Sequence, residues 1–293
     1  MKNMKENITK VFTIVPISFW MLFFVAVPLL YIVFISFMQR GDDGSIVYVA
    51  TLSNYTRMAR PLYAKVFWDS ILVAFTTTIF TLGFGYPFAY FATKIKKYKI
   101  LILLLIMAPF LTNSLIRTYG WIVILSNDGI LNHTLLITGI IKEPLKMLYS
   151  YGAVMVGMIY TMFPFMVLPL YNSIDKMDKA YIEAAKDLGA SSWKTFRTVT
   201  VPLTMPGIVA GCILVFVPSV GLFFIPDLMG GSNVMLIGNL IENQFMEAND
   251  WPFGAALSIV MIFISLILIL VYVKIVGKKL DKIGRASCRE RVF

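Results

Sequence analysis

The chain has 293 residues, of which 58% are hydrophobic and 14% are charged, and its formal net charge is +10. One soluble core of this length cannot bury so much apolar surface, so the composition excludes a soluble globular protein. The single histidine, His133, excludes a histidine-based catalytic triad, and without a G-x-x-x-x-G-K-[ST] loop the chain does not hold ATP in the P-loop manner.

Six apolar runs approach or exceed the roughly 20 residues that a helix needs to cross a bilayer. They are 11–37, 67–93, 100–125, 151–174, 205–226 and 254–276. The first is too long for the apolar part of a secretory signal and no small-residue cleavage site follows it, so we expect a retained span. Pro206, Pro218 and Pro226 predict that the fifth is interrupted. The pattern indicates an all-α, polytopic membrane protein with six transmembrane helices.

The runs and loops divide the chain into segments. We expect a cytoplasmic N-terminus at 1–10, a first helix with its outer loop at 11–65, a membrane core at 66–276 and a cytoplasmic tail at 277–282. The last stretch, 283–293, looks like translated sequencing-adapter read-through, so we expect it to have no role in function.

Lysine and arginine are distributed unevenly between the loops. Basic residues are frequent before the first run, between the second and third runs, in the loop 175–204 and after the last run. The outer loops hold fewer: Arg40, Arg57, Arg60 and Lys65 in the first, Lys142 and Lys146 in the second. The positive-inside rule therefore predicts that both termini and the loop 175–204 are cytoplasmic.

Polar residues inside the apolar runs are costly to bury in lipid and are candidates for a transport path. Asn113, Arg117 and Gly120 in the third run recur at i, i+4 and i+7, which predicts one shared, inward-facing side of a helix. We expect Arg117 to pair with a carboxylate or with carbonyl oxygens, and we favour a structural or snorkelling role over direct substrate contact. Tyr160 in the fourth run is a further path candidate. Gly207 and Gly211 in the fifth run indicate close helix packing rather than transport.

The end of the fifth run and the outer loop after it favour a positively charged substrate. An unwound segment between Pro218 and Pro226 can point carbonyl oxygens at a cavity. The loop 227–253 contains four acidic residues and no lysine or arginine, and aromatic residues such as Phe223 and Trp251 border it. Carboxylates and aromatic faces suit a flexible organic polycation, with cation–π contacts of about 0.5–2 kcal/mol per ring. A solvated loop with an interfacial aromatic belt is the simpler reading of any single residue, but Asp227, directly after the broken run, is expected in the path.

A polar, helix-forming insert lies between the fourth and fifth runs. Its sequence, Glu183-Ala-Ala-Lys-Asp-Leu-Gly189, predicts a helix that ends at a glycine in the left-handed conformation. Ala184 and Ala185 would leave one face flat for a partner, although a solvated surface helix is the simpler alternative. Read through to Val201-Pro202, the stretch EAAKDLGASSWKTFRTVTVP resembles the EAA loop of ABC-importer permeases, whose coupling helix docks on a separate ATPase. The resemblance assigns ATPase docking to Glu183, Ala184, Ala185, Gly189, Val199 and Pro202, with Val199 where isoleucine is frequent.

Further stretches resemble the first of the two permease subunits of bacterial spermidine/putrescine importers. They include Gly85-Tyr-Pro-Phe-Ala-Tyr90, Pro109-Phe-Leu-Thr-Asn-Ser-Leu-Ile-Arg117, Pro202-Leu-Thr-Met-Pro-Gly-Ile208, Asp227-Leu-Met-Gly-Gly231 and Asp250-Trp-Pro-Phe-Gly-Ala255. The resemblance implies the type I ABC-importer permease fold (MetI-like) and no cofactor on this chain, because a partner ATPase binds ATP and Mg. It implies two ATPase copies, a second, different permease subunit, a periplasmic or surface-anchored polyamine-binding protein, a small polycation as substrate and membrane lipid around the chain, with no nucleic acid. It implies location in the bacterial plasma (inner) membrane.

Other classes of function stay open from the residues alone. The nearest is a permease of the same superfamily that carries thiamine, iron or an opine. A secondary transporter driven by an ion gradient normally has repeated halves, and we find no convincing repeat. A membrane enzyme is disfavoured by the single histidine and the lack of a nucleophile signature.

Overall fold

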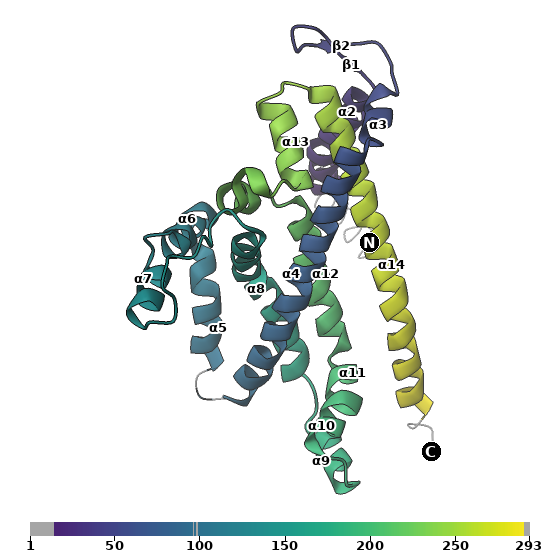
Figure 1. Ribbon diagram of the computed structural model, residues 1–293. Coiled ribbons are helices and arrows are strands. Elements are labelled where there is room, and N and C mark those ends of the chain that lie inside the picture. The colour runs from purple at the N-terminus through teal and green to yellow at the C-terminus, as the bar shows by residue number, and fades with distance from the viewer. Residues whose placement is uncertain (1–14, 96, 98, 290–293) are drawn as a thin grey trace, which may run out of the picture. The chain divides into compact units, whose positions relative to one another are not determined.

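The computed structural model describes residues 15–95, 97 and 99–289, and their side chains as far as residue 274 apart from 99, 100 and 109. The expected cytoplasmic segment 1–10, Lys96 and residues 290–293 of the adapter-like stretch lie outside the described residues. The described chain is helical apart from loops and one short β-hairpin (Figure 1), in agreement with the predicted all-α class.

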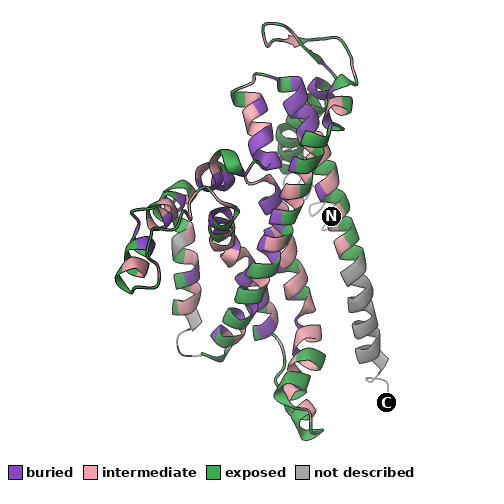
Figure 2. Cartoon of the chain, viewed as in Figure 1, coloured by how far each residue is buried: buried purple, intermediate pink, exposed green. Residues whose placement is uncertain are grey.

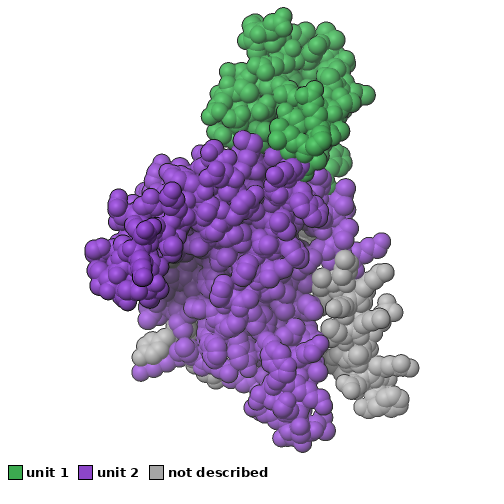
Figure 3. All heavy atoms as spheres, viewed as in Figure 1, with its two compact units in different colours: residues 1–64, 240–263 green, residues 65–239, 264–293 purple. Residues whose placement is uncertain are grey.

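The chain forms two compact units (Figure 3). Unit 1 comprises Met1–Ala64 and Leu240–Phe263, and unit 2 comprises Lys65–Asn239 and Ile264–Phe293. Unit 1 begins with a helix from Val15 to Ser36, which contains the π-helical turn η1 (Leu22–Ala26) and α2 (Val27–Ser36). It continues with β1 (Gln39–Arg40), the antiparallel β2 (Ile46–Val47) and α3 (Ser53–Met58). Most of α13 (Ile237–Met246) and the first third of α14 (Trp251–Arg289) complete it.

Unit 2 is built from the remaining helices. Its elements are α4 (Pro61–Lys94, from Lys65 onward), α5 (Lys99–Met107), the 3-10 turn η3 (Ala108–Leu111), α6 (Ser114–Leu125), α7 (Ile130–Ile137), α8 (Tyr151–Asp175), α9 (Ala180–Asp187), α10 (Ser192–Thr195), the π-helical turn η4 (Phe196–Thr200), α11 (Val201–Leu203), α12 (Met205–Gly221), the π-helical turn η5 (Pro226–Gly230) and the 3-10 turn η6 (Gly231–Asn233). The end of α14 belongs to the same unit.

Four helices of the described chain are each long and apolar enough to cross a membrane. They are Val15–Ser36, Pro61–Lys94, Tyr151–Asp175 and Trp251–Lys274, which match four of the predicted runs. The fifth run, 205–226, falls mainly in the second half of a helix pair, Ser192–Leu203 and Met205–Gly221, that is bent by 66°. The third run is divided into α5, η3 and α6, so the prediction of one continuous helix over 100–125 is wrong.

Packing in unit 2 centres on α8, whose buried side is visible in Figure 2. Helix α12 lies along α8, and Met166 of α8 is fully buried. A Cβ atom at Gly207 would lie 2.4 Å from Cβ of Ser173, and one at Gly211 would lie 2.7 Å from Sδ of Met166. Both glycines therefore permit close approach of two helices, as the sequence predicts.

The predicted face shared by Asn113, Arg117 and Gly120 does not form. Asn113 precedes α6 with a non-helical backbone, and its side-chain oxygen accepts a hydrogen bond from the amide of Leu115 (2.8 Å), as an N-cap residue does. Gly120 is exposed. Pro109 lies in η3 and has no amide hydrogen to donate, so the helix breaks before Asn113 and the 3.6-residue period fails across the break.

Candidate functional site: coupling segment and transport path

The polar insert folds as predicted from its capping residues. Helix α9 ends at Asp187, and Gly189 has a φ of +77°. The amide of Gly189 donates to the carbonyl of Lys186 (2.8 Å), and that of Ala190 donates to the carbonyl of Ala185 (3.0 Å). This bonding closes the helix, and a Cβ at position 189 would meet no described atom within 4 Å. Glycine is therefore needed for backbone conformation rather than for space.

The segment from α9 to α10 exposes apolar side chains. Leu188 is 89% exposed, and Tyr181 and Trp193 are also exposed. Figure 2 shows that most of α9 and α10 is exposed. Glu183 and Ala184 are exposed and Ala185 is half-buried. Several exposed large apolar residues in a short polar stretch are typical of a protein-binding surface. Leu188 and Trp193 were not among the predicted docking residues, although their apolar character within a polar insert was a usable signal.

Aromatic rings fasten the second half of the insert to α4. Trp193 stacks on Phe196 with ring centroids 5.6 Å apart, and Phe196 meets Tyr86 edge-on at 5.5 Å. A second residue of α4, Tyr90, lies 6.3 Å from Phe196. Val199 is half-buried in the same π-helical turn. We define the coupling segment as residues 180–204. Its C-terminal half therefore packs against α4, and its N-terminal half is exposed.

The bend between α11 and α12 is fixed by hydroxyl groups. Thr204 is fully buried at the bend, and its hydroxyl donates to the carbonyl of Thr200 (2.8 Å). The hydroxyl of Tyr86 is 2.8 Å from Oγ1 of Thr204, and Ser173 of α8 donates to the carbonyl of Thr204 (3.4 Å). Pro202 lies in the first turn of α11, where no amide donor is needed. The coupling segment is thus hydrogen-bonded to both α4 and α8 at its bend, a junction that the sequence analysis missed.

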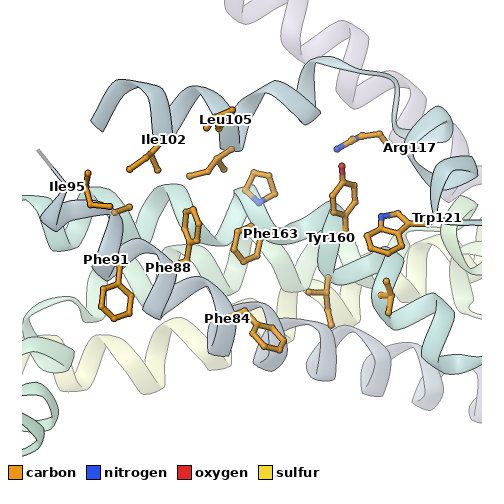
Figure 4. A pocket seen from close by; sticks show the side chains of 15 residues that line it. Phe84, Phe88, Phe91, Ile95, Ile102, Leu105, Arg117, Trp121, Tyr160 and Phe163 are labelled. Carbon is orange, nitrogen blue, oxygen red and sulfur yellow. The ribbon is translucent and has the colours of Figure 1, made fainter. Parts of the chain in front are cut away.

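A large apolar cavity lies between α4, α5, α6 and α8. Its volume is about 900 Å³, and aromatic rings form much of its wall (Figure 4). Two predicted path residues, Arg117 and Tyr160, lie together at one end of it beside Trp121, whose ring meets Tyr160 at 5.5 Å. None of the residues that line the cavity in the described chain is acidic.

Arg117 contacts rings rather than acids. Its guanidinium carbon is 5.2 Å from the centroid of Phe110 and 5.9 Å from that of Tyr160. Its Nε atom is buried and has no hydrogen-bond partner among the described residues. The expected pairing with a carboxylate or carbonyl oxygen is therefore not found there, and cation–π contact takes its place.

The break predicted between Pro218 and Pro226 is present but shorter than expected, because only Leu222 and Phe223 are non-helical. Helix α12 continues through Pro218 and ends at Gly221, and η5 begins at Pro226. The carbonyl of Phe223 accepts hydrogen bonds from the amide of Asp227 (3.0 Å) and from the side chain of Asn239 (2.8 Å). This carbonyl is consequently engaged and does not offer the open cation ligand that the sequence suggests. Asp227 is exposed in the first turn of η5, which contacts α6 and α8.

Trp251 lies in unit 1, at the start of α14, with its ring edge-on to Phe245 at 5.6 Å. The preceding residue, Asp250, is 1% exposed, and its Oδ2 accepts a hydrogen bond from Arg57 (2.7 Å). This acidic residue is therefore paired by an arginine of α3, although its own loop, 227–253, contains no basic residue. The predicted path residues are not gathered in one site: Arg117 and Tyr160 share a cavity, while the others lie at a cap, a break and the start of α14.

Comparison with known proteins places the chain in a family. The profile of the binding-protein-dependent transport system inner membrane components matches residues 7–282. The chain belongs to this family. It is therefore an inner-membrane transport component rather than an enzyme, and its transport depends on a substrate-binding protein.

Individual relatives match over nearly the full length. The spermidine/putrescine transport system permease protein PotB of Escherichia coli strain K12 is 48% identical over 260 residues, which cover 88% of this chain and 94% of PotB. PotB of Haemophilus influenzae is 43% identical over 285 residues, covering 96% and 99%. A bacterial alginate ABC transporter, solved in complex with an alginate pentasaccharide-bound periplasmic protein, has a TM-score of 0.79 at 15% identity and covers 95% of this chain and 97% of its own. The predicted ABC-importer permease fold is confirmed.

Removal of the Tyr86 hydroxyl tests the junction at the bend. We expect the transporter assembled with Tyr86→Phe to move about two- to tenfold fewer substrate molecules per ATP, which corresponds to a hydrogen bond of about 0.5–1.5 kcal/mol. The ring contact with Phe196 stays, so membrane insertion is unchanged. Uptake and ATP hydrolysis measured in the same proteoliposomes give the ratio. Tyr90→Phe is the control, because Tyr90 also contacts Phe196 but its hydroxyl makes no hydrogen bond with described residues. If both variants transported the same number of substrate molecules per ATP, the Tyr86–Thr204 hydrogen bond would have no role in coupling.

Proposed function

We propose that this chain is a transmembrane permease subunit of an ATP-driven ABC importer that moves spermidine and putrescine across the bacterial plasma membrane. The observation that carries the proposal is the identity of 43–48% to PotB proteins over 88–96% of the chain. The identity extends across the coupling segment and the membrane helices together. Relatives at this level over full length share a fold and a site arrangement.

The importer would be assembled from several proteins. Two ATPase copies bind ATP and Mg, a second, different permease completes the membrane part, and an external polyamine-binding protein delivers the substrate. The exposed end of the coupling segment, with Glu183, Ala184, Leu188 and Gly189, supports docking to an ATPase. Both termini and the coupling segment then face the cytoplasm, in keeping with the lysine-rich inner loops.

Transport follows from two conformations that ligands stabilise unequally. When the ATPase pair closes on ATP, it draws the docked coupling segments together, and the bend at Thr204 passes this movement to α4 and α8. Hydrolysis releases the segments, and the path opens to the cytoplasm. The loaded binding protein must bind one of the two conformations more tightly, because a ligand shifts an equilibrium only by its difference in affinity.

The path needs both rings and carboxylates for a polycation. The apolar cavity supplies aromatic faces but no acid from its described lining, and Arg117 already occupies the space near the rings of Phe110 and Tyr160. Asp227, exposed on a turn that contacts α6 and α8, is the carboxylate of unit 2 that we place in the path. Carbonyl groups and carboxylates of the second permease would complete it.

Transport assays test the substrate class. The complex of this chain with its partner permease, ATPase and binding protein is reconstituted in proteoliposomes and supplied with labelled spermidine. We expect uptake that needs hydrolysable ATP and that unlabelled putrescine and spermidine inhibit, while thiamine does not. Uptake without ATP would favour a secondary transporter, and uptake of thiamine, iron or an opine in place of polyamines would assign the chain to another substrate.

Charge changes in the coupling segment test ATPase docking. We expect Glu183→Lys and Gly189→Asp to leave the chain inserted in the membrane but to lower ATP-dependent uptake at least about tenfold, since a docking contact of about 2 kcal/mol is lost at the interface centre. Gly189→Asp also forces a side chain into a positive-φ conformation at the helix end. Membrane abundance, uptake and ATP hydrolysis are measured together. Glu143→Lys, an equal charge change at an exposed loop residue, is the control. Wild-type uptake by both variants would contradict the docking assignment.

Neutralising Asp227 tests the path. Asp227→Asn keeps the size of the side chain and removes the charge, so we expect uptake at limiting spermidine to fall about tenfold or more, as for loss of a charged hydrogen bond of about 1.5–3 kcal/mol. Membrane abundance and binding-protein docking should not change. Asp128→Asn, at another exposed aspartate, should transport at the wild-type rate. Unchanged uptake by Asp227→Asn would exclude this residue from the path.

A further inference from the structure

Unit 1 contains a polar pocket that the proposed transport path does not use. Its volume is about 370 Å³, and Gln39, Arg40, Asn54, Arg57, Arg60 and Asp250 are among the residues that line it. We call it the arginine pocket. Three guanidinium groups face one carboxylate among the described lining residues, so the pocket carries an excess of positive charge.

The one carboxylate is already engaged. Oδ1 of Asp250 accepts a hydrogen bond from the amide of Phe253 (3.2 Å), and Oδ2 accepts one from Arg57 (2.7 Å) with Arg40 at 3.8 Å. Burial alone would lower the pKa of Arg57, but its hydrogen bonds with Asp250 and Tyr63 outweigh this and raise the pKa. Arg57 thus pairs closely with Asp250, and Arg40 shares the same carboxylate at a longer distance, which leaves Arg60 without a matching acid in the pocket.

The residues around the Arg57–Asp250 pair are fixed by contacts within unit 1, so the pocket is preformed. Asn54 donates to the carbonyls of Ser36 and Met38, both at 2.9 Å, which fixes α3 against the end of α2. The guanidinium of Arg57 lies 4.0 Å from the centroid of Phe253. A preformed wall lowers the entropic cost of binding, because few side chains must be ordered.

Two of the arginines retain donors for an external acid. One terminal nitrogen of Arg40 donates to the carbonyl of Ala248 (2.7 Å) and the other lies 3.8 Å from Oδ2 of Asp250, but 44% of the side chain is exposed and further N–H donors of the guanidinium face solvent. Arg60 is exposed and makes no side-chain hydrogen bond or ion pair with any residue that the structure describes. Asp43 of the neighbouring hairpin does not line the pocket, and the hydroxyl and amide of Ser45 hydrogen-bond its carboxylate and lower its pKa.

The charge of the cargo decides what the pocket binds. If the chain imports a polycation, an outward pocket with excess arginine repels that cargo, so the pocket is not part of its path. An arginine fork matches a carboxylate in bidentate geometry. Exposed apolar residues of the same loop, Tyr48, Val49 and Leu52, add the composition that is common at protein interfaces.

We propose that the arginine pocket receives acidic side chains of the loaded substrate-binding protein, with Arg40 and Arg60 as the recognising groups. This inference depends on the proposed function for its partner and for the outward orientation of the loop 37–60. The polycation then enters through a path that contains carboxylates. The binding protein that carries it docks instead on the positively charged arginine pocket. Opposite charges on the pocket and on the binding protein speed their encounter and favour one orientation of the binding protein on this surface.

Charge reversal tests the proposal. The complete transporter is placed in nanodiscs, and the affinity of spermidine-loaded binding protein is measured at low and high salt for the wild type, Arg60→Glu and Arg40→Glu. We expect each reversal to weaken binding about tenfold or more at low salt and to reduce its salt dependence. Arg60→Lys should keep most of the affinity. Lys65→Glu, the same charge change at an exposed residue outside the pocket, should bind within about twofold of the wild type.

The outcomes separate this inference from the proposed function. Binding by both reversed variants at wild-type affinity would overturn the arginine pocket but leave the importer intact. A wild-type transporter that binds no binding protein at all would instead contradict the proposed function. If the reversals lowered uptake without changing the affinity for binding protein, and only in nanodiscs with anionic lipid, the pocket would be a lipid headgroup site and the proposal would be wrong. Basal ATP hydrolysis by the variants checks that they are folded.

Discussion

Lipid cannot hydrogen-bond to the backbone, so every break in a membrane helix must be satisfied by the protein itself. The structure meets this constraint with a few side chains. Asn113 caps α6 after the turn η3, Asn239 binds the carbonyl of Phe223 after α12, and the hydroxyl of Thr204 binds the carbonyl of Thr200 at the bend. These breaks fall beside the cavity, at the start of the candidate acidic turn and at the end of the coupling segment. The places where regular helix stops are therefore the places where the chain can change shape or meet a substrate.

Local sequence patterns predict the structural elements that are determined by neighbouring residues alone. Apolar runs of sufficient length identify the helices at Val15–Ser36, Pro61–Lys94, Tyr151–Asp175 and Trp251–Lys274. Gly189 predicts the end of α9 because a left-handed residue there requires no distant contact. The bend at Thr204 was not predicted, because it depends on Tyr86, which lies 118 residues earlier in the chain.

Two of the expectations that the structure does not meet have the same origin. The helical period placed Asn113 and Arg117 on one face, but a period holds only while the helix is unbroken, and Asn113 is a cap. The loop 227–253 looked unbalanced because its basic partner, Arg57, is 193 residues away from Asp250. Composition counts charge within a loop, whereas ion pairs form between loops that the fold brings together. Hydropathy and capping residues consequently predict the helices and where they end. Contacts between residues that are far apart in the sequence become known only from the structure.

The two ends of the coupling segment differ in their contacts: its C-terminal half packs against α4 and α8, whereas α9 is exposed. A force applied at α9 can therefore be transmitted to the two long helices. Around its C-terminal half, rings from Trp193 and Phe196 reach α4, and the Thr204 junction reaches both α4 and α8. Around α9, in contrast, Leu188 is almost fully exposed and Gly189 has empty space around it. A partner that moved the exposed end would therefore act through the junction on two long helices at once. Those helices also form part of the wall of the aromatic cavity, so a shift of the bend would change the shape of that cavity without any direct contact between the partner and the cavity.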